Sequence, residues 1–70
     1  MSDEVLRERF NLTARQIEVA RLLGEGHTNA EIAAKLEMSY YTARNHTEQV
    51  LAKLAVSSRA AVGALLYGQG

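Results

Sequence analysis

The sequence has no cysteine, no proline and no tryptophan among its 70 residues. Without cysteine, the chain has no disulfide bond, no thiolate metal site and no cysteine nucleophile. Without proline, no ring constraint prevents any segment from forming a helix. No apolar run approaches the roughly 18 residues of a membrane-spanning helix, and no signal-peptide pattern opens the chain. We therefore expect a protein of a reducing compartment, the cytoplasm, that is held together by packing alone and has no membrane partner.

The short length of the chain also limits its function. A chain of 70 residues makes one small domain, which buries only about 60% of the surface that its unfolded form exposes. The sequence shows no nucleophile–base pair, no phosphate-binding loop and no metal-ligand spacing. We therefore expect neither an enzyme nor a cofactor or metal site. Glu18 and Arg59 are expected to be structural residues or to pair with each other.

Charge is balanced overall but unevenly distributed. The eight basic and eight acidic residues give a net charge of zero, whereas nucleic-acid-binding domains are usually basic. Residues 1–38 carry a net charge of −2 (five basic, seven acidic residues), and residues 39–70 carry +2. The positive excess arises because Arg44, Lys53 and Arg59 are opposed by Glu48 alone. An anionic partner is therefore expected to contact the second half of the chain.

Apolar spacing predicts an all-α fold, a compact four-helix domain without strands. The expected helices cover residues 14–24, 29–36, 40–54 and 58–67. Gly24 and Gly26 are expected to end the first helix, since glycine readily adopts the left-handed conformation. Residues 1–11 are expected to form an N-terminal lead-in or a short helix, and residues 12–68 the domain itself.

Capping residues support these boundaries. Thr13 and Thr28 each precede a helix, and Gln16 and Glu31 follow them three residues later. This spacing predicts a capping box at the start of both helices. Ser39 is expected to cap the next helix in the same way.

A short helix joined to a longer one by a three-residue turn is typical of a helix-turn-helix. In that motif the second helix enters the DNA major groove and the first lies across it. Ala33 and Ala43 supply the small residues needed where the helices cross, and Met38 can fill the corner of the turn. The recognition helix is therefore expected over about residues 40–54.

Successive blocks of the sequence resemble the LuxR-type (GerE-like) DNA-binding domain from Leu12 to about Leu66. The blocks are LTARQIEVARLL, EGHTNAEIAAKL, MSYYTARNHTEQVLAKL and VSSRAA. The resemblance implies a four-helix, bacterial DNA-binding transcription regulator that usually acts as a dimer. The residues that match the family's pattern are Glu18, Gly26, Asn29, Glu31, Ile32, Ala33, Thr42 and His46, and Arg44 stands where the pattern has lysine.

The sequence departs from that family at three positions. Gln16 stands where glutamate is usual, which keeps the capping function but removes a charge. Ala43 replaces a common valine. Glu48 lies one turn beyond Arg44, where family members often carry a basic or neutral polar contact residue. Phosphate repels such an acid, so Glu48 must either accept a hydrogen bond from cytosine or brace Arg44.

The residues expected to bind DNA are Thr28, Tyr40, Tyr41, Thr42, Arg44, Asn45, Glu48 and Lys53. Arg44 suits a guanine or phosphate contact, the alternative being an exposed pair with Glu48. Asn45 suits adenine but could equally be merely exposed. Of Tyr40 and Tyr41, one is expected to contact phosphate and the other to pack on the core.

The remaining candidates are polar residues with a plain structural alternative. Thr28 and Thr42 lie at helix N-termini, which favour anions, but Thr28 also serves as a cap. Lys53 would contact the DNA backbone if it faces DNA and would otherwise be solvated. His46 is expected to be a buried, hydrogen-bonded structural residue beside Ala43 and Val50.

The last helix is apolar on almost every side, which is typical of a helix buried on more than one face. One side is expected to pack on the domain core and the other on a second copy across a two-fold axis. A neighbouring domain or the N-terminal segment would be the alternative cover. The expected dimer-interface residues are Ala61, Val62, Leu65 and Leu66, with Gly63 and the alanines permitting close approach.

Two functions therefore remain. The first is a sequence-specific regulator that binds double-stranded DNA as a homodimer on two half-sites. The second is a protein-interaction co-regulator or anti-activator on the same fold, favoured by the zero net charge and by Glu48. A regulatory domain or partner protein outside this chain is a further expected partner.

Overall fold

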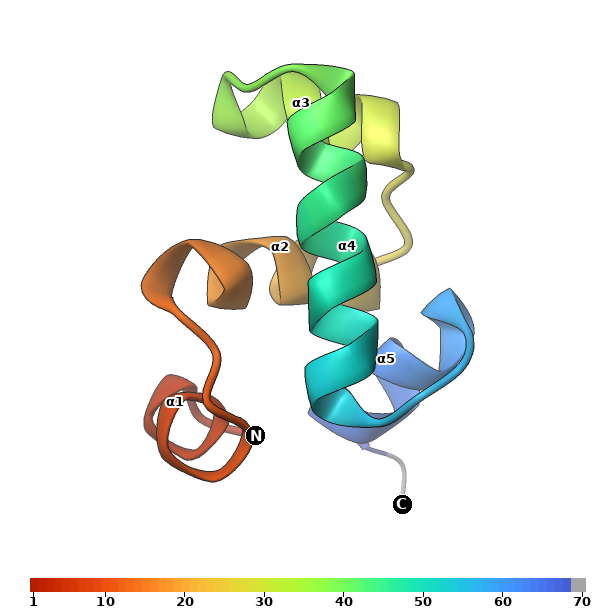
Figure 1. Cartoon of the computed structure of the whole chain (residues 1–70). Coiled ribbons are helices and arrows are strands. Elements are labelled where there is room, and N and C mark those ends of the chain that lie inside the picture. The colour runs from red at the N-terminus through yellow and green to blue at the C-terminus, as the bar shows by residue number, and fades with distance from the viewer. Residues whose placement is uncertain (69–70) are drawn as a thin grey trace.

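Residues 1–68, which this computed structural model describes, form five α-helices and no strand (Figure 1). The helices are α1 (Asp3–Phe10), α2 (Ala14–Gly24), α3 (Asn29–Leu36), α4 (Tyr40–Leu54) and α5 (Arg59–Tyr67). The all-α prediction is confirmed, and α2, α3 and α4 have the predicted bounds. Of the two alternatives for residues 1–11, the short helix is the one that forms, and residues 12–68 contain the four helices expected.

Both predicted capping boxes are present. Thr13 Oγ1 accepts a hydrogen bond from Gln16 N at 3.1 Å, and Thr13 N donates to Gln16 Oε1 at 3.1 Å. Thr28 and Glu31 make the same reciprocal pair at 3.1 and 3.0 Å. These bonds satisfy backbone N–H groups that have no partner within the helix, which is why α2 and α3 begin where the sequence predicts.

Three helices end at a non-glycine residue in the left-handed region. Asn11 follows α1 with φ 61°, Glu37 follows α3 with φ 56°, and Ala55 follows α4 with φ 59°. Asparagine visits this region readily, but for other L-residues it costs about 1–2 kcal/mol. Glu37 and Ala55 therefore adopt this conformation at an energetic cost, which the packing of α3 and α4 offsets.

The helix α2 ends at Gly24 as expected, but Gly24 itself does not adopt the left-handed conformation. It is the last residue inside α2, and the residue with positive φ after this helix is Gly26, at 94°. A Cβ atom on Gly63 would lie 2.9 Å from the carbonyl oxygen of Gly24, and one on Gly24 would lie 2.8 Å from the ring of Tyr67. The two glycines therefore allow α2 and α5 of one chain to pack closely, so Gly63 is not free to make such a contact with a second chain.

The core draws on all five helices and includes part of the expected dimer interface. Val62 is fully buried and Leu66 is only 1% exposed within the single chain. These two residues were assigned to a dimer interface, and that assignment is wrong because their side chains already pack in their own core. Ala61 and Leu65 are half-buried and stay available.

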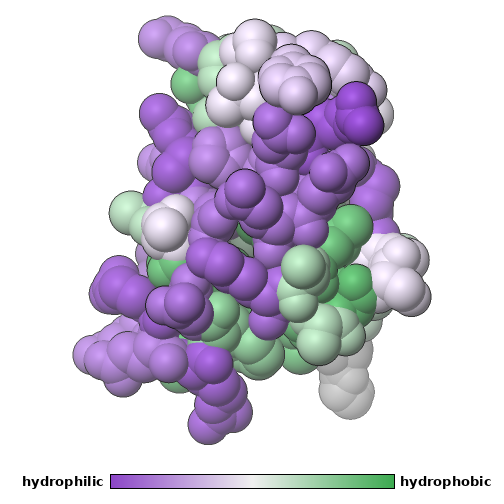
Figure 2. Space-filling model, in the orientation of Figure 1, coloured by the Kyte–Doolittle hydropathy of each residue, from purple (hydrophilic) through white to green (hydrophobic). Residues whose placement is uncertain are grey.

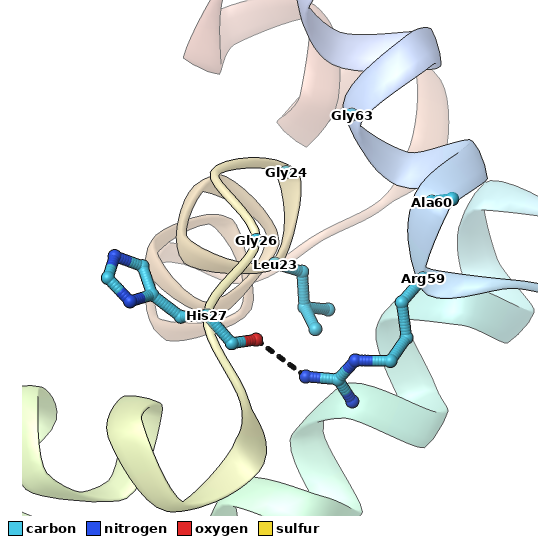
Figure 3. A pocket seen from close by; sticks show the side chains of 7 residues that line it. All are labelled: Leu23, Gly24, Gly26, His27, Arg59, Ala60 and Gly63. Atoms are coloured by element: carbon cyan, nitrogen blue, oxygen red, sulfur yellow. Dashed lines mark hydrogen bonds between the residues drawn. The ribbon is translucent and has the colours of Figure 1, made fainter.

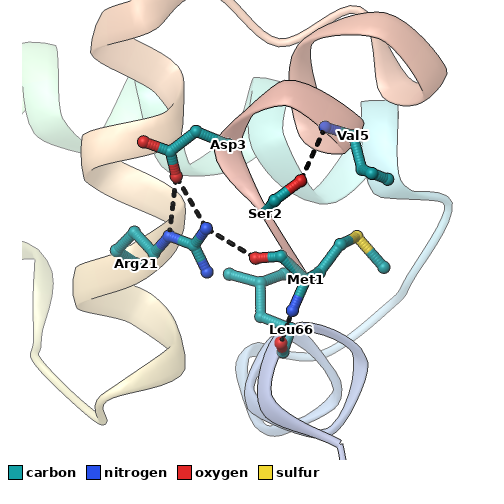
Figure 4. A network of polar contacts seen from close by, with 6 residues as sticks. All are labelled: Met1, Ser2, Asp3, Val5, Arg21 and Leu66. Carbon is teal, nitrogen blue, oxygen red and sulfur yellow. Dashed lines mark hydrogen bonds and ion pairs between the residues drawn. The ribbon is translucent and has the colours of Figure 1, made fainter.

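The N-terminus covers part of α5, which was the alternative to a dimer (Figure 4). The Met1 amino group donates to the carbonyl oxygen of Leu66 at 2.7 Å. Arg21 donates through Nη2 to Met1 O and to Asp3 Oδ1, both at 2.6 Å. The hydrogen bond with Asp3 raises the pKa of Arg21, and the guanidinium lies 5.8 Å from the ring centroid of Tyr67. These contacts fix α1 against α2 and α5.

The helices are arranged so that α3 lies at one end of α4, and α1 and α5 lie at the other (Figure 1). Taken one at a time, the helices in residues 1–68 are too short or too polar to cross a membrane; α4 and α5 reach the required length and composition only as a pair bent by 57°.

Candidate DNA interface

The predicted helix-turn-helix is confirmed by α3, the turn 37–39 and α4. Ala33 and Ala43 are both buried, and Met38 is half-buried against the core. Met38 N donates to the carbonyl oxygen of Ala33 at 3.0 Å. Ser39 Oγ accepts from Thr42 N at 3.0 Å and so caps α4. The small residues, the corner residue and the cap therefore fix the direction in which α4 leaves the turn.

The outward face of α4 is polar and accessible. Tyr40 and Tyr41 are 56% and 65% exposed, so the expectation that one of them packs on the core is wrong. Thr42 and Arg44 are also exposed, whereas Asn45 is half-buried. Figure 2 shows hydrophilic side chains along the face of α4 that is turned to the viewer. A partner that meets α4 would contact this outward face.

Arg44 and Glu48 form an ion pair on the outward face. Arg44 Nε lies 3.4 Å from Glu48 Oε2, and the two side chains are 53% and 61% exposed. An exposed pair of this kind contributes only about 0.3–0.5 kcal/mol to stability. Within residues 1–68, Nη1 and Nη2 of Arg44 make no hydrogen bond. The two terminal nitrogens are therefore free to donate to a base or a phosphate.

Thr28 and Thr42 each have a hydroxyl hydrogen to donate. Thr28 Oγ1 accepts from Glu31 N, and Thr42 Oγ1 accepts from Ser39 Oγ at 3.0 Å. In both contacts the threonine oxygen is the acceptor, so its own hydrogen stays available. Because Thr28 and Thr42 stand at the N-termini of α3 and α4, a phosphate there would also be favoured by the helix dipole.

Glu31 places a negative charge beside Thr28. Its carboxylate accepts the backbone N–H of Thr28 and lies 3.3 Å from His27 Nδ1. The bond from Thr28, and then the contact with His27, lower the pKa of Glu31. Glu31 therefore keeps its negative charge to a lower pH than an unpaired glutamate, and its carboxylate is hydrogen-bonded by the Thr28 N–H.

Lys53 is held within the domain. Its Nζ donates to Asn11 O at 2.9 Å and to Gln16 Oε1 at 2.8 Å. Gln16 is only 4% exposed, and its Nε2 donates to Gln49 Oε1 at 2.7 Å. Gln16 thus joins α2 to α4 through both ends of its amide, and two of the three N–H donors of Lys53 serve this connection.

A polar network that was not predicted from the sequence joins the helix-turn-helix to the rest of the domain. Asn29 Oδ1 accepts from Thr47 Oγ1 at 2.8 Å and from Arg59 Nη1 at 3.0 Å. Arg59 Nη2 donates to His27 O at 2.7 Å (Figure 3). These bonds connect the loop before α3, α3 itself, α4 and α5. Arg59 is therefore structural, as expected, but its partner is not Glu18, which pairs with Arg15 at 3.0 Å.

Thr47 takes the place on the inward face of α4 that was expected for His46. Thr47 is only 4% exposed, whereas His46 is half-buried. The Nδ1 atom of His46 is buried and has no hydrogen-bond partner in the described part of the chain, so the expected hydrogen bond is absent there. The buried residues Ala43, Thr47, Val50 and Leu54 recur every three or four positions, and this spacing was the signal that could have identified Thr47.

Within the part of the chain that the structure describes, the pocket beside the helix-turn-helix carries no catalytic arrangement. A pocket of about 160 Å³ lies between the end of α2 and the start of α5 (Figure 3). Its polar side chains are those of His27 and Arg59, and the Arg59 guanidinium already donates to two acceptors. Among residues 1–68, no group of three or more His, Cys, Asp or Glu side chains could hold a metal ion.

Comparison with known proteins places this geometry in a family. The family model described as "Bacterial regulatory proteins, luxR family" (GerE) matches residues 10–65. The chain is similar to the "Transcriptional regulatory protein LnrK" of Bacillus subtilis, with 44% identity over 63 residues, and to LiaR of the same organism, with 41% over 49 residues. It is also 35% identical over 48 residues to the "Response regulator protein VraR" of Staphylococcus aureus.

These relatives are much longer than the matched region. The matches cover 87%, 70% and 69% of this chain, but only 29%, 23% and 23% of LnrK, LiaR and VraR respectively. The chain thus spans less than a third of the length of these curated relatives. No solved structure gives a significant match.

Proposed function

The chain belongs to the luxR family of bacterial regulatory proteins, and we propose that it binds a specific double-stranded DNA sequence in the bacterial cytoplasm and regulates transcription there. The observation that carries this proposal is the pair of faces on α4. One face is buried and fixes the helix, while the other presents Tyr41, Arg44 and Glu48 to solvent. A helix held in this way fits the major groove, which admits one α-helix.

The residues of the interface divide into two roles. Arg44 and Asn45 would read base edges from α4, since arginine suits guanine and asparagine suits adenine. Phosphate contacts would set the register, and the hydroxyl groups and the remaining lysine donor suit them. The residues proposed for phosphate contacts are Thr28, Tyr40, Tyr41, Thr42 and Lys53. Because two N–H donors of Lys53 are already engaged, Lys53 would contribute less than the others.

We propose that the protein binds as a homodimer to two DNA half-sites that lie about one helical turn, roughly 10 bp, apart. The accessible part of α5 supports this assembly, because Ala61 and Leu65 are half-buried in the single chain. We also propose that a regulatory domain controls the DNA-binding domain. The matched relatives are more than three times longer than the region they share with this chain, and VraR is named a response regulator.

Substitution of Arg44 tests the proposed reading face. Arg44→Ala is expected to lower affinity for a DNA site selected by the wild type by about 1–3 kcal/mol, because the guanidinium would supply a base contact. The measurement is selection from random duplex DNA at about 100 mM salt, followed by titration of the enriched site. The free energy of unfolding should change by less than about 0.5 kcal/mol, because the pair with Glu48 is exposed.

Arg15→Ala is the matched control. Arg15 is also exposed and also pairs with a glutamate, Glu18 at 3.0 Å, but it lies on α2. Its loss removes the same charge without touching α4, so the affinity should fall much less. If the two variants lose equal affinity for the selected DNA site, Arg44 contributes only its charge. The residues that read the bases would then lie outside α4.

A charge on the accessible face of α5 tests the dimer. Leu65→Glu is expected to convert a dimer into monomers in sedimentation, and to replace an enriched inverted repeat by a single half-site. Circular dichroism must show a folded protein, as expected for a half-buried position. A folded Leu65→Glu variant that stays dimeric would contradict an interface through α5.

The alternative function is that of a co-regulator or anti-activator, in which a domain with this same fold binds another protein instead of DNA. The zero net charge of the chain favours it, since non-specific affinity for DNA depends on net positive charge. A folded wild-type protein that enriches no DNA sequence would support this alternative over the DNA-binding regulator.

A further inference from the structure

Glu48 is the one acidic residue of α4, and its geometry leaves an acceptor open. It stands on the outward face, one turn after Arg44, with 61% of its side chain exposed. Only Oε2 contacts Arg44, and the contact is made to Nε. Among residues 1–68, Oε1 of Glu48 has no hydrogen-bond partner, and neither have the two terminal nitrogens of Arg44. The pair therefore presents two donors and one acceptor side by side.

These free groups match the edges of two different bases. The two terminal nitrogens of an arginine suit O6 and N7 of guanine, and a carboxylate oxygen suits the N4 amino group of cytosine. Adenine also offers an amino group, but its neighbouring N7 is an acceptor that repels a carboxylate. Positions four apart on a helix are about 6 Å apart along its axis, and stacked bases are about 3.4 Å apart. The two contacts would therefore fall one or two base pairs apart.

We propose that Arg44 and Glu48 form one reading unit for a guanine and a cytosine that lie one or two base pairs apart, and that Glu48 determines specificity by disfavouring every other base at its position. This inference rests on the proposed function, since it requires α4 in the major groove. A carboxylate that lies between phosphates and meets no hydrogen-bond donor on a base is repelled by their negative charge. Glu48 therefore weakens binding to every DNA site that lacks the cytosine. This repulsion at incorrect DNA sites adds to the specificity that favourable contacts at the correct site provide.

Substitution of Glu48 by glutamine separates this role from simple bracing of Arg44. Wild type, Glu48→Gln and Arg44→Ala are each used to select from random duplex DNA at about 100 mM salt. Arg44→Ala identifies the guanine position as the one whose preference it loses. In Glu48→Gln, the ratio of the affinity for sites with the cytosine to that for sites without it is expected to fall about tenfold, as for one mismatched base pair. It should also bind random DNA more tightly than the wild type, because a negative charge is gone.

Glu18→Gln is the matched control. It removes a carboxylate that is also exposed and also paired with an arginine, Arg15, but on α2. The selected sequence should then be the same as that of the wild type, with a cytosine one or two base pairs from the guanine.

Two outcomes would overturn the reading unit while leaving the proposed function intact. One is a cytosine preference that persists in Glu48→Gln. The other is a Glu48→Gln variant that loses the guanine preference alone, which would make Glu48 only a brace for Arg44. A folded wild-type protein that enriches no sequence would instead contradict the proposed function, and the reading unit with it.

Discussion

On the inward face of α4, Ala43, Thr47, Val50 and Leu54 are buried, whereas on its outward face Arg44 and Glu48 keep more than half of their side chains exposed. The inward residues contact other helices, and Thr47 is hydrogen-bonded to Asn29 of α3. The ion pair of the outward face lies within α4 itself. The fold therefore depends on the inward face, while the outward face can change without unfolding the domain. This division lets one scaffold present different side chains to different partners.

The largest effect on stability is expected from the acceptor shared by the inward network. Asn29→Ala removes the oxygen that accepts from both Thr47 and Arg59. The buried hydroxyl of Thr47 then has no partner, and leaving a buried donor unsatisfied costs about 1–3 kcal/mol. We expect the free energy of unfolding to fall by about 2–3 kcal/mol in urea denaturation. Asn45→Ala, on the accessible side of α4, should change it by less than about 0.5 kcal/mol.

A double-mutant cycle sharpens this prediction. If the bond between Asn29 and Thr47 is the cause, Thr47→Val should destabilise the Asn29→Ala variant less than it destabilises the wild type, with a coupling of about 0.5–3 kcal/mol. Additive losses would show that the two residues act separately, and that the inward face is held by packing alone.

A smaller effect of opposite sign is expected at the end of α4. Ala55 adopts φ 59°, which is unfavourable for alanine and unstrained for glycine. Ala55→Gly is therefore expected to raise the free energy of unfolding by up to about 1 kcal/mol. Ala52→Gly, three residues earlier inside α4, should lower it by roughly 0.5–1 kcal/mol. If both substitutions destabilise the domain, strain at Ala55 is too small to matter.

The helices could be predicted from the sequence because their boundaries are local. Thr13, Thr28 and Ser39 accept hydrogen bonds from backbone groups only three residues away, so each start can be read within a few positions. The crossing of α3 and α4 was predictable for a similar reason, since a three-residue turn leaves Ala33 and Ala43 little freedom in where they meet.

The parts that sequence reasoning missed depend on contacts between distant residues. Asn29 and Arg59 are 30 positions apart, and no local pattern joins them. The apolar face of α5 was equally ambiguous, because Val62 and Leu66 look the same in sequence whether a core or a second chain covers them. The roles of Arg44 and Glu48 at DNA stay predictions, since base contacts depend on a partner and not on the fold.

The smallest effect is expected from the exposed carboxylate of α3. The pKa of Glu31 lies below its ordinary value of 4.5 because Thr28 N–H and His27 contact the ionised form. The resulting stabilisation is complete above pH 4.5 and is lost as the pH falls through the lower folded-state pKa. Glu31→Gln keeps an oxygen for the capping box, as Gln16 does in α2, but cannot titrate. As the pH falls below 4.5, the free energy of unfolding of this variant should therefore fall less steeply than that of the wild type in urea denaturation. Parallel pH profiles of the two proteins would contradict this prediction, because they would mean that the charge of Glu31 adds nothing to the stability of the folded chain.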